Sequence, residues 1–203
     1  GHRSVPEFIG LLVAVLSTSV AMAEACGPAY GVTTVAEVYP SVDRLPSNLL
    51  RFYVYFDGPM RRDSVLEHVS LTDHEGRVVD GVFYRGRFEL WSPAATRLPL
   101  LLDPGRIKTG VTANEEQGSS LMPGQRYQLN IKKDALDQRG CALGKDFSKV
   151  FIATKSDLSA PRISDWRVIA PPVATTEPVR VELDGAHDHT SLAHRIRVRT
   201  PQG

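Results

Sequence analysis

The stretch that decides the fold is "NLLRFYVYFDGPM", residues 48–60. Apolar residues occupy every second position from Leu50 to Phe56, and an arginine and two tyrosines fill the positions between them. Because successive side chains of a strand point to opposite faces, this alternation predicts a strand with one buried face. The Asp57-Gly58-Pro59 sequence then ends the strand, since these residues favour turns and interrupt sheet pairing.

Short apolar runs of the same kind recur between turn residues along residues 31–154. The expected strands are 31–40, 48–56, 69–73, two within 77–91, 96–103, 125–131 and 148–154, and residues 61–68 are expected to form a single helical turn. Seven or eight short strands with regular turn signals are typical of a Greek-key sandwich. The sequence therefore predicts an all-β fold, an Ig-like Greek-key β-sandwich of about seven strands.

The N-terminus predicts a signal peptide over residues 1–23. Residues 8–23 carry no charge, Arg3 precedes them, and the small residues of Ala21-Met22-Ala23 close them in the pattern of a cleavage site. The alternative is a transmembrane anchor, although the run is shorter than the roughly 20 residues that a spanning helix needs. We therefore expect an exported protein, located in the periplasm, in the cell envelope or outside the cell, with no membrane span after cleavage.

Export would allow the two cysteines, Cys26 and Cys141, to form a disulfide. Cys26 precedes the first expected strand, and Cys141 lies in a turn before the last one. In an Ig-like sandwich the first strand often runs parallel beside the last, which would bring the two cysteines together. Two unpaired thiols are the alternative, with Cys26 as a lipid-carrying first residue, but Glu24 fits a lipoprotein signal badly.

Composition and motifs exclude several classes of function. The formal net charge is +1 and the arginines are scattered, so neither nucleic acid nor an anionic membrane surface is an expected partner. The sequence holds no carboxylate pair that we can assign as acid and base, no nucleophile motif and no phosphate-binding glycine loop. We expect a protein that is not an enzyme and needs no cofactor.

The end of the chain repeats the decisive stretch. When residues 183–203 are aligned with residues 56–76 without a gap, Asp184-Gly185 falls on Asp57-Gly58. The apolar positions keep phase across the alignment: Phe52 with Val179, Val54 with Val181, Phe56 with Leu183, Val65 with Leu192, Val69 with Ile196, and Leu71 with Val198. An internal repeat of this kind indicates tandem modules.

The repeat divides the chain into domains. Residues 24–156 are expected to form a complete sandwich, and residues 157–178, rich in Pro, Ser and Thr, a connector with one further strand near 163–170. Residues 179–203 are expected to begin a second Ig-like module. Since a few strands cannot enclose a sandwich core, we expect a longer protein to complete this truncated module.

The order of the motifs resembles the bacterial Ig-like domain of the SbsA type, found in S-layer and other envelope proteins. The matching motifs, within residues 32–156, are Phe56 to Met60, Tyr127 to Ile131, Asp137 to Gly140 and Phe151 to Thr154. The stretches "ELWSP", "DPGRIKTG" and "NEEQG" further resemble uncharacterised exported bacterial proteins that carry this domain. The resemblance implies a non-catalytic module with a structural, adhesion or ligand-recognition role, and an envelope protein or polysaccharide as partner.

Two other classes of function stay open at this point. The chain could be a carbohydrate- or protein-binding accessory module of a larger secreted enzyme, or a periplasmic metal-binding protein. The candidate metal ligands are His187, His189 and His194, because H-x-H on a strand places both imidazoles on one face. The alternative is an ordinary polar turn. Arg195, Arg197 and Arg199 alternate with apolar residues and are expected to form a solvated strand face.

The candidate binding residues lie in a polar loop that is longer than a hairpin needs. They are Arg106, Lys108, Asn114, Glu115 and Glu116. Long loops on a rigid sandwich are frequent binding sites. The alternative for Arg106 is a local ion pair that holds the loop. Trp91 is expected to be a rim or core aromatic, with ligand stacking as its functional alternative.

Overall fold

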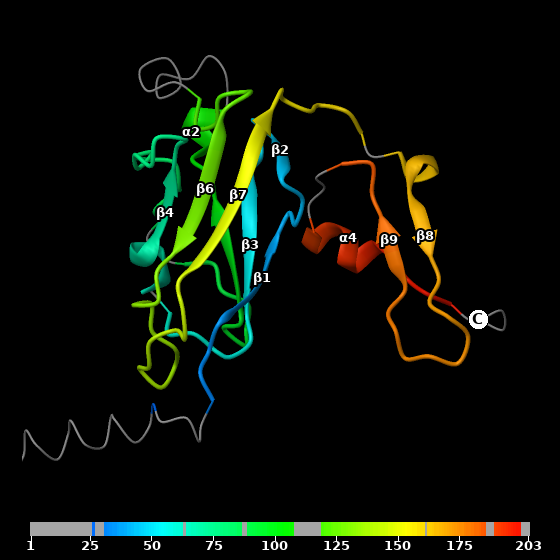
Figure 1. The fold of residues 1–203 in the computed structure, drawn as a ribbon, viewed down its shortest axis with the longest axis horizontal. Coiled ribbons are helices and arrows are strands. Elements are labelled where there is room, and N and C mark those ends of the chain that lie inside the picture. The colour runs from blue at the N-terminus through cyan, green and yellow to red at the C-terminus, as the bar shows by residue number, and fades with distance from the viewer. Residues whose placement is uncertain are drawn as a thin grey trace, which may run out of the picture.

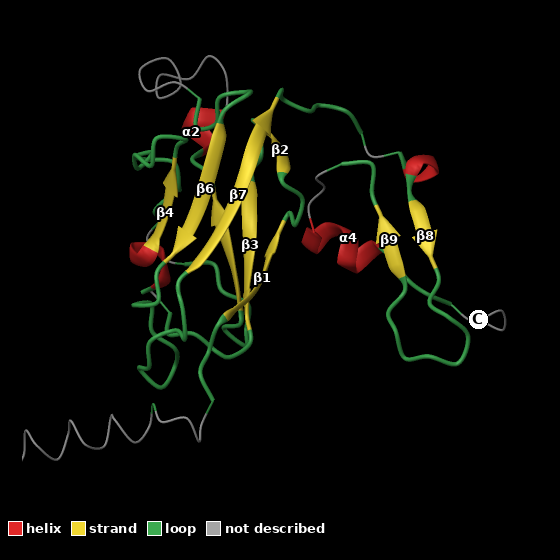
Figure 2. Ribbon diagram, viewed as in Figure 1, coloured by secondary structure: helices red, strands yellow, loops and turns green. Residues whose placement is uncertain are grey.

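The computed structural model describes residues 26, 31–62, 64–86, 89–107, 119–160, 162–185 and 189–199. Within them, seven strands form a sandwich and two more form a separate pair beside a helix (Figures 1 and 2). In chain order the elements are β1 (Val35–Tyr39), β2 (Arg44–Pro46), β3 (Arg51–Phe56), the 3-10 helix η2 (Val65–His68), β4 (Val69–Thr72), β5 (Arg97–Leu101), α2 (Pro104–Ile107), β6 (Arg126–Ile131), β7 (Phe147–Thr154), η3 (Ile163–Asp165), β8 (Arg167–Ile169), β9 (Arg180–Glu182) and α4 (His189–Arg195).

Two sheets make the sandwich. One has the antiparallel order β1-β3-β5, and the other has the order β2-β7-β6-β4. In the second sheet β2 runs parallel to β7, whereas β7, β6 and β4 are antiparallel. The expected all-β sandwich is confirmed. The parallel pairing beside the last strand is made by β2, however, and not by the first strand as the sequence suggested.

The core lies between the two sheets and takes one face of each strand. Phe52, Val54 and Phe56 of β3 are 0%, 0% and 5% exposed, as their alternation predicts. The ring of Phe52 packs against that of Phe151 from β7, with centroids 5.6 Å apart. Leu50 departs from the pattern: it is 57% exposed because it precedes β3.

The described residues of segment 77–91 do not form the two strands expected there. They make isolated bridges, between Thr72 and Val78 and between Phe83 and Leu102. Gly81 adopts a φ of 61°, in the left-handed region, and this turn interrupts strand pairing between the two bridges. The strand β2 was missed because three residues, Arg44–Pro46, are too short to show alternation.

The second unit consists of β8, β9 and α4. Residues 195–199 do not form the expected strand: Arg195 ends α4, and residues 196–199 have no regular structure. The aligned residues Val69–Thr72 are held as a strand by their pairing with β6, and no described strand pairs with residues 196–199. In the part of the chain that the structure describes, no helix is long and apolar enough to span a membrane. The expected signal peptide, residues 1–23, lies outside that part.

A pair of leucines tests the position of the core. Leu100→Ala removes a side chain that is 0% exposed and should lower the free energy of unfolding by about 2–5 kcal/mol. Leu50→Ala, the matched control at a 57% exposed position, should change it by less than about 0.5 kcal/mol. Urea denaturation monitored by tryptophan fluorescence measures both. Equal losses for the two variants would contradict this placement of the core.

Candidate functional site

A polar cluster of the sandwich surrounds the carboxylate of Asp137, which is 1% exposed. This carboxylate accepts the backbone N–H groups of Arg139 at 2.8 Å and Cys141 at 2.9 Å. The Arg139 guanidinium donates to it at 2.7 Å, and the Thr33 hydroxyl at 3.2 Å. Arg139 also donates to the carbonyl of Gly31 at 3.0 Å. The turn before the last strand is thereby tied to the segment that enters β1.

A disulfide reinforces the same connection. Cys26 and Cys141 form a disulfide, with their Cα atoms 5.4 Å apart and a sequence separation of 115. Cys141 is also a donor to Asp137, so the covalent link and the buried carboxylate meet at one residue. The N-terminal segment is thus held at the closing turn of the sandwich by two independent means.

The "FDGPM" stretch lies directly beside this cluster. The carboxylate of Asp57 accepts the backbone N–H and the hydroxyl of Thr34, each at 2.7 Å. Gly58 allows Thr33 to approach, because a Cβ at this position would lie 2.7 Å from the Thr33 hydroxyl oxygen. The carbonyl of Pro59 accepts the backbone N–H of Gln138 at 2.9 Å. Asp57 and Pro59 therefore accept hydrogen bonds that hold the entry to β1 and the closing turn, and Gly58 leaves the space that Thr33 needs.

The environment of Asp137 fixes its charge. Burial alone would raise the pKa of this carboxyl, but the hydrogen bonds from Cys141 and Arg139 outweigh burial and hold the pKa below its usual value. Five groups, Thr33, Asp57, Gly58, Asp137 and Arg139, contribute to the lining of a shallow surface pocket of about 730 Å³. The two carboxylates in the pocket already accept several protein donors, so the cluster fits a structural role.

The predicted binding loop begins at the other end of the sandwich. Arg106 lies in α2, where the carboxylate of Asp103 accepts the backbone N–H of Gly105 at 2.9 Å. Figure 1 shows α2 at the end opposite the β6–β7 turn. The other four predicted residues, Lys108, Asn114, Glu115 and Glu116, lie outside the described residues. Their part in a binding surface stays a prediction.

Trp91 lies at the margin of the core. Its ring centroid is 5.8 Å from that of Phe56, with the planes tilted by 40°. The indole N–H donates to Glu89, whose other carboxylate oxygen accepts the backbone N–H of Leu66 at 2.9 Å. These contacts fix the position of the indole. Ligand stacking by Trp91 stays a prediction.

Two of the three predicted metal ligands lie in a helix: α4 begins at His189 and includes His194. The third, His187, lies outside the described residues. Among the residues that the structure describes, no three His, Cys, Asp or Glu side chains are grouped to hold a metal ion. The metal site stays a prediction.

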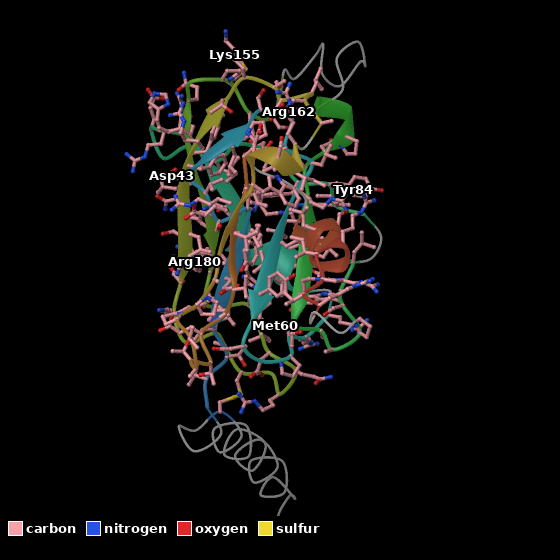
Figure 3. All side chains as sticks on the ribbon, turned by 90° about the vertical axis from the view of Figure 1, so that its right-hand side faces the viewer. Asp43, Met60, Tyr84, Lys155, Arg162 and Arg180 are labelled. Atoms are coloured by element: carbon pink, nitrogen blue, oxygen red, sulfur yellow. A yellow bond between two sulfur atoms is a disulfide. The ribbon has the colours of Figure 1, made fainter. Side chains whose placement is uncertain are left out.

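The outer face of the β1-β3-β5 sheet is rich in tyrosine. Tyr39 and Tyr55 contact edge to face at 5.7 Å, and the Arg97 guanidinium lies 5.9 Å from the ring centroid of Tyr53. A hydrogen bond to Glu37 and burial raise the pKa of Tyr39 to about 12. Figure 1 shows α4 between β9 and the sandwich, and Figure 3 shows the molecule from the β8–β9 side. Sequence reasoning missed this face because the tyrosines stand at the positions assigned to solvent.

Comparisons with known proteins identify no family. No family model matches the chain, and no curated protein matches it. A structure of native alpha-2-macroglobulin from Escherichia coli, spanning domains MG0-NIE-MG1, aligns with 69% of this chain and 36% of its own length, at 15% identity and a TM-score of 0.38. The S-layer protein rSbsC aligns with 76% of this chain and 18% of its own, at 15% identity and a TM-score of 0.41. This chain thus spans about a third of the first solved chain and under a fifth of the second.

Asp137→Asn tests the charge at the closing turn. A carboxyl with a depressed folded pKa contributes stability above its unfolded pKa, about 3.9, and that contribution is lost as the pH falls through the folded pKa. At pH 7, where Asp137 carries its charge, the free energy of unfolding of the variant should be about 1–3 kcal/mol lower than that of wild type. Between pH 5 and pH 2 it should fall by less than that of wild type. Urea midpoints over this pH range measure both effects.

The matched control is Asp134→Asn, at an exposed carboxyl on the preceding turn. It should leave stability at pH 7 nearly unchanged. An Asp137→Asn variant as stable as Asp134→Asn at pH 7 would contradict the structural role assigned to the buried carboxylate.

Proposed function

We propose that this chain is a non-catalytic, exported Ig-like module of the SbsA type, with a recognition role at the bacterial cell envelope. The observation that carries the proposal is the joining of Cys26 to Cys141 beside the Asp137 carboxylate. Disulfides persist in oxidising compartments such as the periplasm and the cell surface, and are rare in the cytosol. The chain combines a sandwich closed by a disulfide with an N-terminal sequence typical of a signal peptide. Both features fit an oxidising compartment such as the periplasm or the cell surface.

The recognition surface that we propose is the α2 end of the sandwich, with Arg106, Lys108, Asn114, Glu115 and Glu116. This end lies away from the disulfide-closed turn, so the closed end can act as a rigid base (Figure 1). Loops on a rigid scaffold lose less conformational freedom on binding than loops on a mobile one. The loop carries charges of both signs, which suits a polar polysaccharide or a mixed-charge protein surface.

The test uses the full chain, exported from a bacterial host, and purified peptidoglycan sacculi as the probe. Arg106→Ala combined with Lys108→Ala should weaken cosedimentation with sacculi about tenfold, equivalent to about 1.4 kcal/mol. The matched control, Arg61→Ala with Lys145→Ala, removes the same two charges from exposed positions at the other end of the sandwich and should bind like wild type. Equal binding by both double variants would contradict the assignment of the loop. If wild type bound neither sacculi nor envelope proteins, the recognition role itself would be wrong.

A further inference from the structure

The chain that leaves the sandwich after β7 stays attached to the segment that follows β2. The two parallel strands end together at the Pro46–Thr154 pair. Beyond this pair the backbone N–H of Ser47 donates to the carbonyl of Thr154 at 3.0 Å, and the hydroxyls of Ser47 and Ser156 share a hydrogen bond at 3.0 Å. Ser47 is 6% exposed, so water has little access to its side of these contacts.

The amide of Asn48 extends this attachment by one further step. Its Nδ2 donates to the backbone carbonyl of Asp157 at 2.7 Å, and its Oδ1 accepts the backbone N–H of the same residue at 3.0 Å. One side chain thus satisfies both backbone groups of Asp157, as a residue of a neighbouring antiparallel strand would. We call these two hydrogen bonds the Asn48–Asp157 clamp.

The carboxylate of Asp157 fixes the residues that come next. Its Oδ1 accepts the backbone N–H of Ser159 at 2.9 Å and also the Ser159 hydroxyl. This is an Asx-turn, in which a side chain takes the place of a backbone acceptor and sets the direction of the chain. A Cβ on Gly185, in the turn after β9, would lie 4.0 Å from the other carboxylate oxygen. Asp157 is therefore bonded to the sandwich through the clamp and lies beside a turn of the second unit.

The second unit, β8, β9 and α4, holds its own entry by a carboxylate as well. Asp184 accepts the backbone N–H of Arg162 at 3.3 Å and the indole N–H of Trp166 at 3.0 Å. Between Ser159 and Arg162 the sequence has two residues, Ala160-Pro161. Because the proline ring fixes one backbone dihedral angle, the two anchored parts of the chain are joined by a link with few rotatable bonds.

These contacts differ from those of a flexible tether. The connector expected at residues 157–178 contains η3 and β8, which are elements of the second unit. A flexible linker moves freely because its residues make few contacts, whereas residues 156, 157 and 159 each bond to a named partner. Figure 3 labels Lys155 and Arg162, between which the chain passes from the sandwich to the second unit.

We propose that the Asn48–Asp157 clamp makes the exit from the sandwich a rigid joint, which holds the second unit in one orientation beside the sandwich in solution. Figure 1 shows that β7 ends at the same end of the sandwich as α2. The joint therefore sets where the second unit stands relative to the proposed recognition loop. This inference rests on the contacts of the clamp and is independent of what the loop binds.

Distances between the two units test the joint in the full chain. Cysteines replace two exposed arginines, Arg126→Cys in β6 and Arg180→Cys in β9, and carry nitroxide spin labels while the native disulfide stays oxidised. Pulsed electron paramagnetic resonance then measures the distribution of distances between the labels. The labelled chain should give one narrow distribution. Asn48→Ala should at least double its width, because both bonds of the clamp are lost.

A second variant and a matched control complete the test. Asp157→Ala removes the Asx-turn to Ser159 and should also widen the distribution, which keeps the proposal testable if Asn48→Ala does not fold. The control, Asn130→Ala, removes amide contacts between β4 and β6 and should leave the width unchanged. A labelled chain whose distribution is as wide as that of Asn48→Ala would overturn the proposal. An unchanged narrow distribution after Asn48→Ala would overturn it equally. Loss of binding to sacculi on substitution of Arg106 and Lys108 would leave these distances unchanged.

Discussion

The buried carboxylate of Asp137 is the contact on which the rest of the sandwich depends. It gathers donors from its own turn and from Thr33, and so connects the closing turn to the segment that enters β1. In the described sheet β1 is an edge strand, with β3 as its partner, and an edge strand exposes unpaired backbone groups unless other contacts hold it. The Cys26–Cys141 disulfide stabilises the same connection by reducing the conformational freedom of the unfolded chain. A link across 115 positions restricts the unfolded chain by about 4–5 kcal/mol on the entropic account.

A carboxylate just after a strand solves a general problem of antiparallel strand pairs. The chain that enters one strand and the chain that leaves its partner lie side by side, with backbone N–H groups that lack ladder partners. Asp57 satisfies such a group at Thr34, and Asp184 does the same at Arg162. Gly58 has a further role, because Thr33 leaves no room for a side chain there, whereas the nearest atom to a Cβ on Gly185 is 4.0 Å away. An aspartate thus serves both the β1–β3 and the β8–β9 pair, and the glycine is sterically required only in the first.

Much of the sandwich could be predicted from the sequence, because a strand with one buried face leaves a period of two in its apolar residues. That signal located β3 and β6, and the turn residues around them fixed their ends approximately. It failed for β2, which is too short to show a period, and for segment 77–91, whose described residues pair through isolated bridges. It also failed for residues 195–199, because a segment with alternating apolar residues forms a strand only where a neighbouring strand pairs with it.

The candidate sites were less predictable. The disulfide pair followed from export and the count of two cysteines, but the role of Asp137 depends on contacts that only the folded chain creates. The tyrosine-rich face of the β1-β3-β5 sheet was missed because tyrosine at alternate positions looks like a solvated face. The predicted binding loop keeps Arg106 at the α2 end, and its other residues lie beyond the described part of the chain.

The central claim is that this is an exported module closed by the Cys26–Cys141 disulfide, and intact mass tests it most directly. The protein would be exported from a bacterial host and its mass measured with and without reductant. The account predicts a chain that begins at Glu24 and gains about two daltons on reduction, as one disulfide requires. A chain that begins at Cys26 with added acyl groups would contradict it, because a lipid-bearing Cys26 cannot pair with Cys141. An unchanged mass on reduction would contradict it equally.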